Sequence, residues 1–277
     1  MNRAALLAVP LALIVPATAT VATGKDPSVT ISATPRPVEV VPLPCFPSGR
    51  LTLGMTNTGR KPVIADLRIS GESPLILSRR QFSSYLPVDQ LVTAPLDVTV
   101  PRGTAPGTFN VDLTSGRDRL TAPVTVKPAP PKGPGDNLLL GEQAVASSTH
   151  GNMKLCGGVD GNSDSAQWGA SGWHDATKGV FPDTYGVDLT GPATIGRIEL
   201  QTLDSARYPA AAMGLRDFDL RIRTAGNWIT INETRGNIQG RVSVSFTPVP
   251  ADAVQVVIHD ANDHGYSRLI ELEAYTN

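Results

Sequence analysis

The chain has 277 residues, of which 24 are Lys or Arg and 25 are Asp or Glu, so its formal net charge at pH 7 is -1. A protein that binds nucleic acid through the phosphates needs a basic surface, and this charge balance argues against that class. The balance is consistent with a neutral partner. The length exceeds that of one ordinary β-sandwich and predicts two domains.

The N-terminus has the pattern of a secretory signal peptide. Arg3 supplies a positive charge, residues 4–15 are an apolar run, and residues 17–19 are small residues of the cleavage type. The apolar run contains Pro10 and is shorter than the roughly 20 residues of a membrane span, so a retained anchor is the less favoured alternative. We therefore predict a signal peptide over residues 1–22 and a secreted, extracellular mature protein.

Residues 27–127 alternate apolar and polar side chains in short runs that end at turn residues. Leu51, Leu53 and Met55 illustrate this period of two, which is typical of half-buried strands. Residues 109–126 read as a hairpin, because a Ser-Gly-Arg-Asp turn separates two such runs. About seven strands are expected, in a length typical of an immunoglobulin-like sandwich.

The next segment, residues 128–136, is rich in proline and glycine and predicts an extended, semi-rigid linker between two domains. We expect it to hold the two domains apart. Short alternating runs resume in residues 137–277, so the whole chain is predicted to be all-β, with two β-sandwiches.

Ordered landmarks run through this second domain. It opens on Asn-Leu-Leu-Leu-Gly at residues 137–141, contains Gly-Val-Asp-Gly-Asn at 158–162 within its first third, and closes on Glu-Leu-Glu-Ala-Tyr at 271–275. These landmarks resemble the coagulation factor V/VIII type C (discoidin) family, a galactose-binding-like jelly roll that includes carbohydrate-binding modules of family 32. Residues 100–109 are similar, more loosely, to bacterial immunoglobulin-like domains that accompany glycosidases. The resemblance implies a non-catalytic protein that binds glycan.

The discoidin resemblance also implies a structural calcium ion. Calcium prefers six to eight oxygen ligands, and oxygen-bearing residues are concentrated just after residue 159. By position, we assign the ligands to a loop and to the last strand, with Glu273 as an alternative strand donor. The assigned ligands are Gly157, Asp160, Asn162, Ser165 and Glu271. An ordinary turn without metal is the alternative interpretation of this loop.

Carbohydrate recognition needs an aromatic face and fixed polar groups. The predicted loops of the second domain offer both, with Tyr266 as the best platform, whereas Trp168 and Trp228 are expected in the core. The candidate ligand-binding residues are Trp173, His174, Arg207, Tyr208, Asp263, His264 and Tyr266. A neutral, galactose-type sugar is the expected ligand of a monomer.

Other functions are less well supported. The apolar loop at residues 208–215 leaves open a phospholipid- or protein-binding module, although membrane insertion is not expected because few basic residues flank it. No nucleophile elbow or zinc helix is present, so no enzyme is predicted, and an accessory role beside a glycoside hydrolase is a further alternative. Cys45 and Cys156 either pair with each other between the domains or are free or intermolecularly paired thiols.

Overall fold

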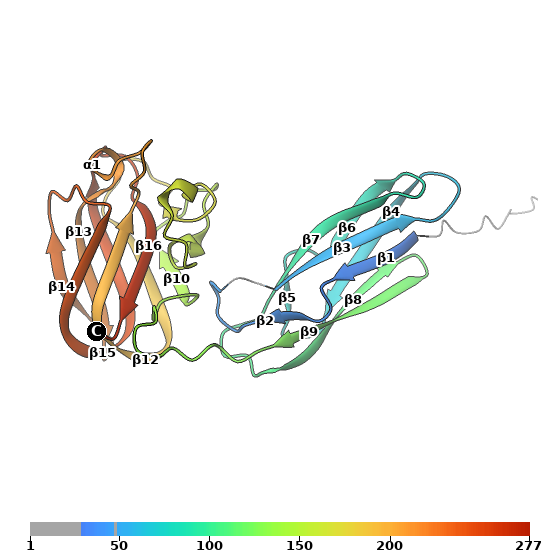
Figure 1. Ribbon diagram of the computed structural model, residues 1–277, viewed down its shortest axis with the longest axis horizontal. Helices are drawn as coiled ribbons and strands as arrows, with labels where there is room; N and C mark the ends of the chain where they lie inside the picture. Colours follow the sequence, from blue (N-terminus) through green and yellow to red (C-terminus); the bar gives the residue numbers. More distant parts are fainter. Residues whose placement is uncertain (1–28, 47–48) are drawn as a thin grey trace, which may run out of the picture.

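The computed structural model describes residues 29–46 and 49–277, and the predicted signal peptide lies outside them. The described chain is almost entirely β, which confirms the predicted fold class, and it contains two separate hydrophobic cores. Figure 1 shows the two β-rich bodies side by side, joined by extended chain. None of the helices within the described residues is long and apolar enough to cross a membrane.

The N-terminal domain is a sandwich of two sheets. One sheet has the strand order β1-β3-β7-β5 and the other β2-β9-β8-β4-β6. Its described residues form nine strands, two more than the seven expected, because short edge strands such as β2 and β5 are too brief for a sequence pattern to reveal. The strands are β1 (Val29–Thr34), β2 (Val38–Val40), β3 (Gly49–Asn57), β4 (Val63–Gly71), β5 (Ile76–Leu77), β6 (Gln81–Leu86), β7 (Leu91–Thr99), β8 (Gly107–Ser115) and β9 (Asp118–Val126).

Alternation along these strands places one face of each sheet in the core. Leu51, Leu53 and Met55 of β3 are all 0% exposed, and the residues between them include the exposed Thr52. Fully burying such a side chain contributes about 1.5–3 kcal/mol. The predicted hairpin is present as β8 and β9, and its turn contains Gly116 at φ +56°, a conformation that glycine adopts without strain.

The C-terminal domain is a jelly roll built around two long strands. Its sheet has the order β11-β16-β12-β15-β13-β14, and β10 also pairs with β12. Register shifts between Asp188 and Ala193 and between Ile195 and Arg197 let β12 bend and serve both faces of the sandwich. The strands are β10 (Gln143–Ala146), β11 (Trp173–His174), β12 (Asp183–Thr202), β13 (Leu215–Thr224), β14 (Asn227–Thr234), β15 (Arg241–Ala261) and β16 (Arg268–Tyr275). The helices are the 3₁₀ turns η1 (Leu155–Gly158) and η2 (Ser165–Gln167) and the short α1 (Ala210–Met213).

The two domains are linked by more than the proline-rich segment. Cys45 of the first domain and Cys156 of the second form a disulfide across a separation of 111 residues. Cys45 is only 5% exposed, belongs to the core of the C-terminal domain, and donates a hydrogen bond from its backbone N–H to the Gly141 carbonyl. Arg102 Nε also donates to Thr190 Oγ1 at 3.1 Å. Domain spacing therefore does not depend on the linker alone.

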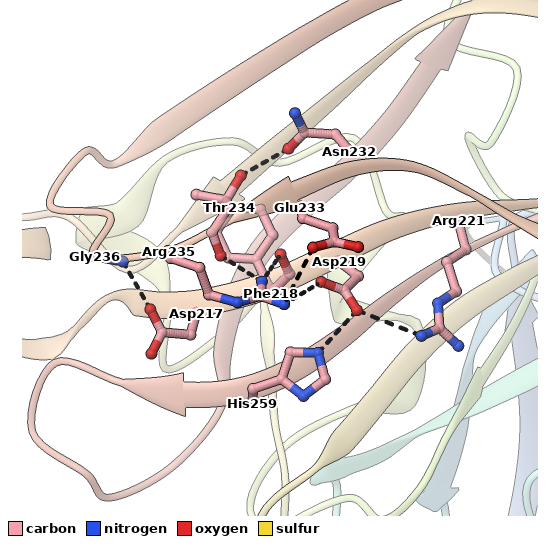
Figure 2. Close-up of polar contacts among 10 residues, drawn as sticks. All are labelled: Asp217, Phe218, Asp219, Arg221, Asn232, Glu233, Thr234, Arg235, Gly236 and His259. Carbon is pink, nitrogen blue, oxygen red and sulfur yellow. Dashed lines mark hydrogen bonds and ion pairs between the residues drawn. The ribbon is translucent and has the colours of Figure 1, made fainter.

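A charged network stabilises the outer strands of the second domain (Figure 2). Asp219 of β13 accepts from Arg235 Nη2 at 2.8 Å and from His259 Nε2 at 2.9 Å, and Arg221 Nη2 lies 3.4 Å away. Burial alone would raise the pKa of Asp219, but the hydrogen bonds from His259 and Arg235 outweigh it and lower the pKa. The network joins β13, the end of β14 and β15.

Candidate functional site

Four aromatic side chains meet where the loops of the C-terminal domain converge on the start of β16. The His174 ring lies 4.5 Å from His150, 4.9 Å from Tyr266 and 5.3 Å from Trp168, measured between ring centroids. His150 and Tyr266 are themselves 6.1 Å apart, edge to face. We call these four residues the aromatic cluster. His174 is positioned by β11, which pairs with β16 and places His174 opposite Arg268.

The hydrogen bonding of His174 fixes its tautomer. Its Nδ1 lies 2.7 Å from the Asp175 carbonyl, which can only accept, so Nδ1 carries the proton and the neutral ring has its lone pair on Nε2. Burial lowers the pKa of His174, with further lowering from His150 and Arg268, and these effects outweigh the hydrogen bond to Asp175. At neutral pH the imidazole therefore offers an acceptor rather than a charge.

The loop behind His174 is held by buried carboxylates. Asp175 is 0% exposed and accepts hydrogen bonds from the backbone N–H of Thr177 at 2.6 Å and of Ser267 at 2.7 Å. Ser267 in turn donates from Oγ to Asp183 at 2.7 Å, and burial raises the pKa of that carboxyl group. Ser267 is adjacent to Tyr266, so these bonds fix the His174 loop against the Tyr266 loop.

Tyr266 is also supported by an ion pair. The Arg268 guanidinium lies 5.6 Å from the Tyr266 ring centroid and binds Asp263 with two parallel bonds of 3.0 and 2.9 Å. Burial would raise the pKa of Asp263, but the hydrogen bonds and charge of Arg268 lower it overall. Such bidentate pairs are stronger and more directional than ordinary hydrogen bonds. Both carboxylate oxygens of Asp263, a predicted ligand contact, therefore bind Arg268.

The burial of each of the three tryptophans differs from the prediction. Trp173, a predicted ligand contact, is 0% exposed, packs on Tyr185 at 4.9 Å and donates from Nε1 to the Ser148 carbonyl, so that prediction is wrong. Trp228, predicted in the core, is 41% exposed. Trp168, also predicted in the core, is half-buried in the aromatic cluster. Trp173 and His174 are both buried, at 0% and 9% exposed, but as successive strand residues they point to opposite faces, and only His174 contacts the aromatic cluster.

Other predicted contacts do not join the cluster. Arg207 is exposed and its guanidinium lies 5.1 Å from the ring of its neighbour Tyr208. His264 has a φ of +53°, a side chain that is 66% exposed, and an Nδ1 bonded to Asp260 at 2.9 Å. Within residues 29–46 and 49–277, no ring contact or hydrogen bond connects these three residues with the aromatic cluster.

Sequence reasoning missed His150, Trp168 and Arg268. One signal was present for Trp168, which is followed by Gly-Ala-Ser-Gly in a loop without alternating apolar residues, a setting unusual for a core tryptophan. No such signal marked His150 or Arg268, since chain folding alone brings them to the site.

Glu271 is the most unusual acid in the domain. It is 0% exposed, its Oε1 accepts from the Gly161 N–H at 3.1 Å, and its buried Oε2 has no hydrogen-bond partner within the described residues. Its pKa is raised to about 8, chiefly by burial and partly by the charges of Asp160 and Glu273, against the lowering effect of the hydrogen bond from Gly161. A buried carboxylate with an orphaned oxygen is stabilised by a cation.

Asp160 lies beside it and faces the same loop. Asp160 Oδ1 accepts from the Asn162 N–H at 3.0 Å, and both carboxylate oxygens lie 2.9 Å from Ser171 Oγ. Glu273, the alternative donor, instead contacts Gln201 at 3.4 Å. Of the two candidate strand acids, Glu271 is therefore the one beside the loop.

The other predicted ligands have protein partners. The Gly157 carbonyl accepts from Gly172 N–H at 2.7 Å, Asn162 Oδ1 caps Asp164, and Ser165 Oγ accepts from Asp204 at 3.3 Å. No group of three or more His, Cys, Asp and Glu gathers at one point in the described part of the chain. The carboxylate, amide, hydroxyl and carbonyl oxygens of this loop are of the type that a hard cation such as calcium prefers.

Comparison with known families agrees with this architecture. Residues 157–256 match the family model described as the NedA-like, galactose-binding domain of the F5/F8 type C group. The C-terminal domain is similar to that family. The matched segment contains Trp168 and His174 of the aromatic cluster, and no curated protein matches the sequence.

Three of the solved structures that are similar to this chain are binding modules. The chitosan-binding module 1 of a chitosanase/glucanase from Paenibacillus sp. IK-5 has 25% identity and a TM-score of 0.42, over 50% of this chain and 98% of that one. The family 32 module of C. perfringens NanJ, in complex with galactose, has 18% identity and a TM-score of 0.41, over 48% and 92%. The family 32 module of Streptococcus pneumoniae EndoD has 21% identity and a TM-score of 0.43, over 51% and 100%.

Proposed function

We propose that this chain is a secreted, non-catalytic carbohydrate-binding protein whose ligand rests on the aromatic cluster. The observation that carries the proposal is the convergence of His150, Trp168, His174 and Tyr266 at the loop end of a domain that matches a galactose-binding family model. Trp168 and Tyr266 supply aromatic surface for the apolar face of a neutral, galactose-type sugar.

The polar groups would orient that sugar. His174 Nε2 accepts a hydrogen bond from a sugar hydroxyl, because Nδ1 is already committed to the Asp175 carbonyl. Arg268 is fixed by Asp263 and supports Tyr266, whose ring centroid lies 5.6 Å from its guanidinium. The site is set on a rigid frame, which limits the entropy lost on binding.

We also propose that calcium stabilises the loop that carries Trp168. Asp160 and Glu271 would hold the ion, and its charge would compensate the buried carboxylate whose Oε2 lacks a partner. Ser171, which donates to Asp160, lies three residues after Trp168. An ordered ion at Asp160 would therefore hold Trp168 in place for the sugar.

Secretion is supported by the predicted signal peptide at residues 1–22 and by the Cys45–Cys156 disulfide, which is typical of oxidising compartments. The phospholipid-binding alternative loses support in the loop at 208–215. Leu215 is 0% exposed, and none of the exposed large apolar side chains belongs to this loop. A protein-binding role or an accessory role beside a glycoside hydrolase is compatible with the same site.

A glycan array tests the proposal with the mature chain, residues 23–277, so that Cys45 is present. Wild-type protein is expected to bind a set of neutral glycans. Trp168→Ala and Tyr266→Ala should each weaken that binding at least about tenfold, since an aromatic contact of about 1.5–3 kcal/mol is lost. Trp228→Ala is the matched control, because Trp228 is exposed outside the cluster. No binding by wild type, or equal loss in the control, would overturn the proposal.

A further inference from the structure

A small cavity lies beside the aromatic cluster. It has a volume of about 220 Å³, smaller than the roughly 300–1,000 Å³ of sites for drug-sized ligands. It is therefore suited to one sugar unit or one substituent. Its walls are formed by Asn152, Met153, Lys154, Gly169, Ala170 and Gly172.

The cavity is built from the same two loops as the cluster. Gly169 and Ala170 directly follow Trp168 in sequence. On the other wall, Asn152 donates from its backbone N–H to His150 Nδ1 at 3.3 Å, and Met153 donates to the His150 carbonyl at 2.8 Å. A ligand on the cluster is thus adjacent to this cavity.

The walls of the cavity are held in place at both sides. Cys156 follows Lys154 by two residues and is tied by the disulfide to the N-terminal domain. Gly172 donates to the Gly157 carbonyl at 2.7 Å. Several wall positions lack long side chains, so a ligand can approach the backbone there.

Lys154 is the one charged residue among the six that line the cavity. It is exposed, and its ammonium forms no hydrogen bond or ion pair with any residue in the described ranges. An ammonium group is a compact charge with three donors, which complements a carboxylate or a sulfate.

We propose that this cavity is a second subsite, in which Lys154 binds an anionic substituent, a carboxylate or a sulfate, of the glycan held by the aromatic cluster. The inference rests on the proposed function and extends it, because it assigns a preference for acidic over neutral glycans. Asn152 would contribute an amide, and Met153 an apolar wall.

The test uses glycan cores that are each printed in neutral, sulfated and sialylated or uronate forms, read at low ionic strength where screening is weak. Wild type should bind at least one acidic form about two- to fivefold more tightly than its neutral core, as expected for an exposed ion pair. The sulfated and carboxylated arms show which anion is taken. Lys154→Met should remove that preference and leave neutral binding and thermal stability unchanged, while Lys61→Met in the N-terminal domain behaves as wild type.

Equal binding of neutral and acidic forms by wild type would overturn the subsite and leave the proposed function intact. A preference that survives in Lys154→Met would also overturn it. Absence of binding to every glycan form would overturn the proposed function together with the subsite.

Discussion

Replacing Glu271 by Gln should remove a pH dependence of stability that the proposed calcium ion would otherwise mask. Glu271 has a folded-state pKa of about 8 against an ordinary value of 4.5, chiefly because it is buried. A carboxyl group whose pKa is raised by folding binds its proton more tightly in the folded state. Without calcium, the free energy of unfolding should therefore fall as the pH rises from about 4.5 to about 8.

The size of this fall follows from linkage. Each pKa unit corresponds to about 1.4 kcal/mol. By pH 7 the unfolded chain has released the Glu271 proton while the metal-free folded protein still holds most of it, which lowers the free energy of unfolding by about 3 kcal/mol. Calcium would offset that cost by pairing with the carboxylate. In Glu271→Gln, the side chain no longer titrates, so both the pH slope and the stabilisation by calcium should disappear.

The assay is urea unfolding followed by tryptophan fluorescence at pH 5.5, 7 and 8, with calcium or with chelator. All three tryptophans, Trp168, Trp173 and Trp228, lie in the C-terminal domain, so the signal reports that domain alone. Glu273→Gln is the matched control and should retain most of the slope, since Glu273 contacts Gln201 instead of the loop. Equal slopes in wild type and Glu271→Gln under chelator would refute the reasoning, and an unchanged midpoint on adding calcium would refute the calcium proposal.

Three further outcomes are expected. Trp173→Ala should destabilise the C-terminal domain by about 3–5 kcal/mol, and Trp228→Ala by far less, because Trp173 is buried and Trp228 is exposed. Urea unfolding measures both, and similar losses in the two variants would contradict the assigned burial. Replacing Cys45 and Cys156 by Ser should lower the free energy of unfolding by about 4–5 kcal/mol on the chain-entropy model for a 111-residue loop, and an unchanged urea midpoint would argue against a stabilising bridge. Glycan affinity should fall as acidification protonates His174, and the midpoint of this fall should lie below pH 6.5 because burial lowers the pKa of His174. Calorimetry across pH 4.5–7.5 measures this, with His174→Gln as the control that does not titrate. A midpoint above pH 6.5 would contradict the assigned burial.

Periodicity was sufficient to predict the all-β class, whereas the jelly roll of the second domain was predicted from its resemblance to the discoidin family. Alternating residues such as Phe218, Leu220 and Ile222 are all 0% exposed in β13, because a strand that packs on a core must bury every second side chain. The short edge strand β5 (Ile76–Leu77) could not be predicted, since two residues carry no period.

The site was predictable only in part. His174 and Tyr266 were named as candidates and lie 4.9 Å apart, whereas Trp173 beside His174 points into the core. Which of two adjacent strand residues faces the ligand depends on the register of β11 with β16, which is set by tertiary pairing. His150 joins the cluster through a loop contact that no local pattern encodes.

The most direct test of the central claim is a chemical-shift titration of the mature protein by NMR with a glycan selected on the array. The ring signals should shift together and saturate with one affinity for His150, Trp168, His174 and Tyr266, while the Trp228 indole stays unchanged. Saturable shifts centred on Trp228 and β14, with none in the aromatic cluster, would contradict it.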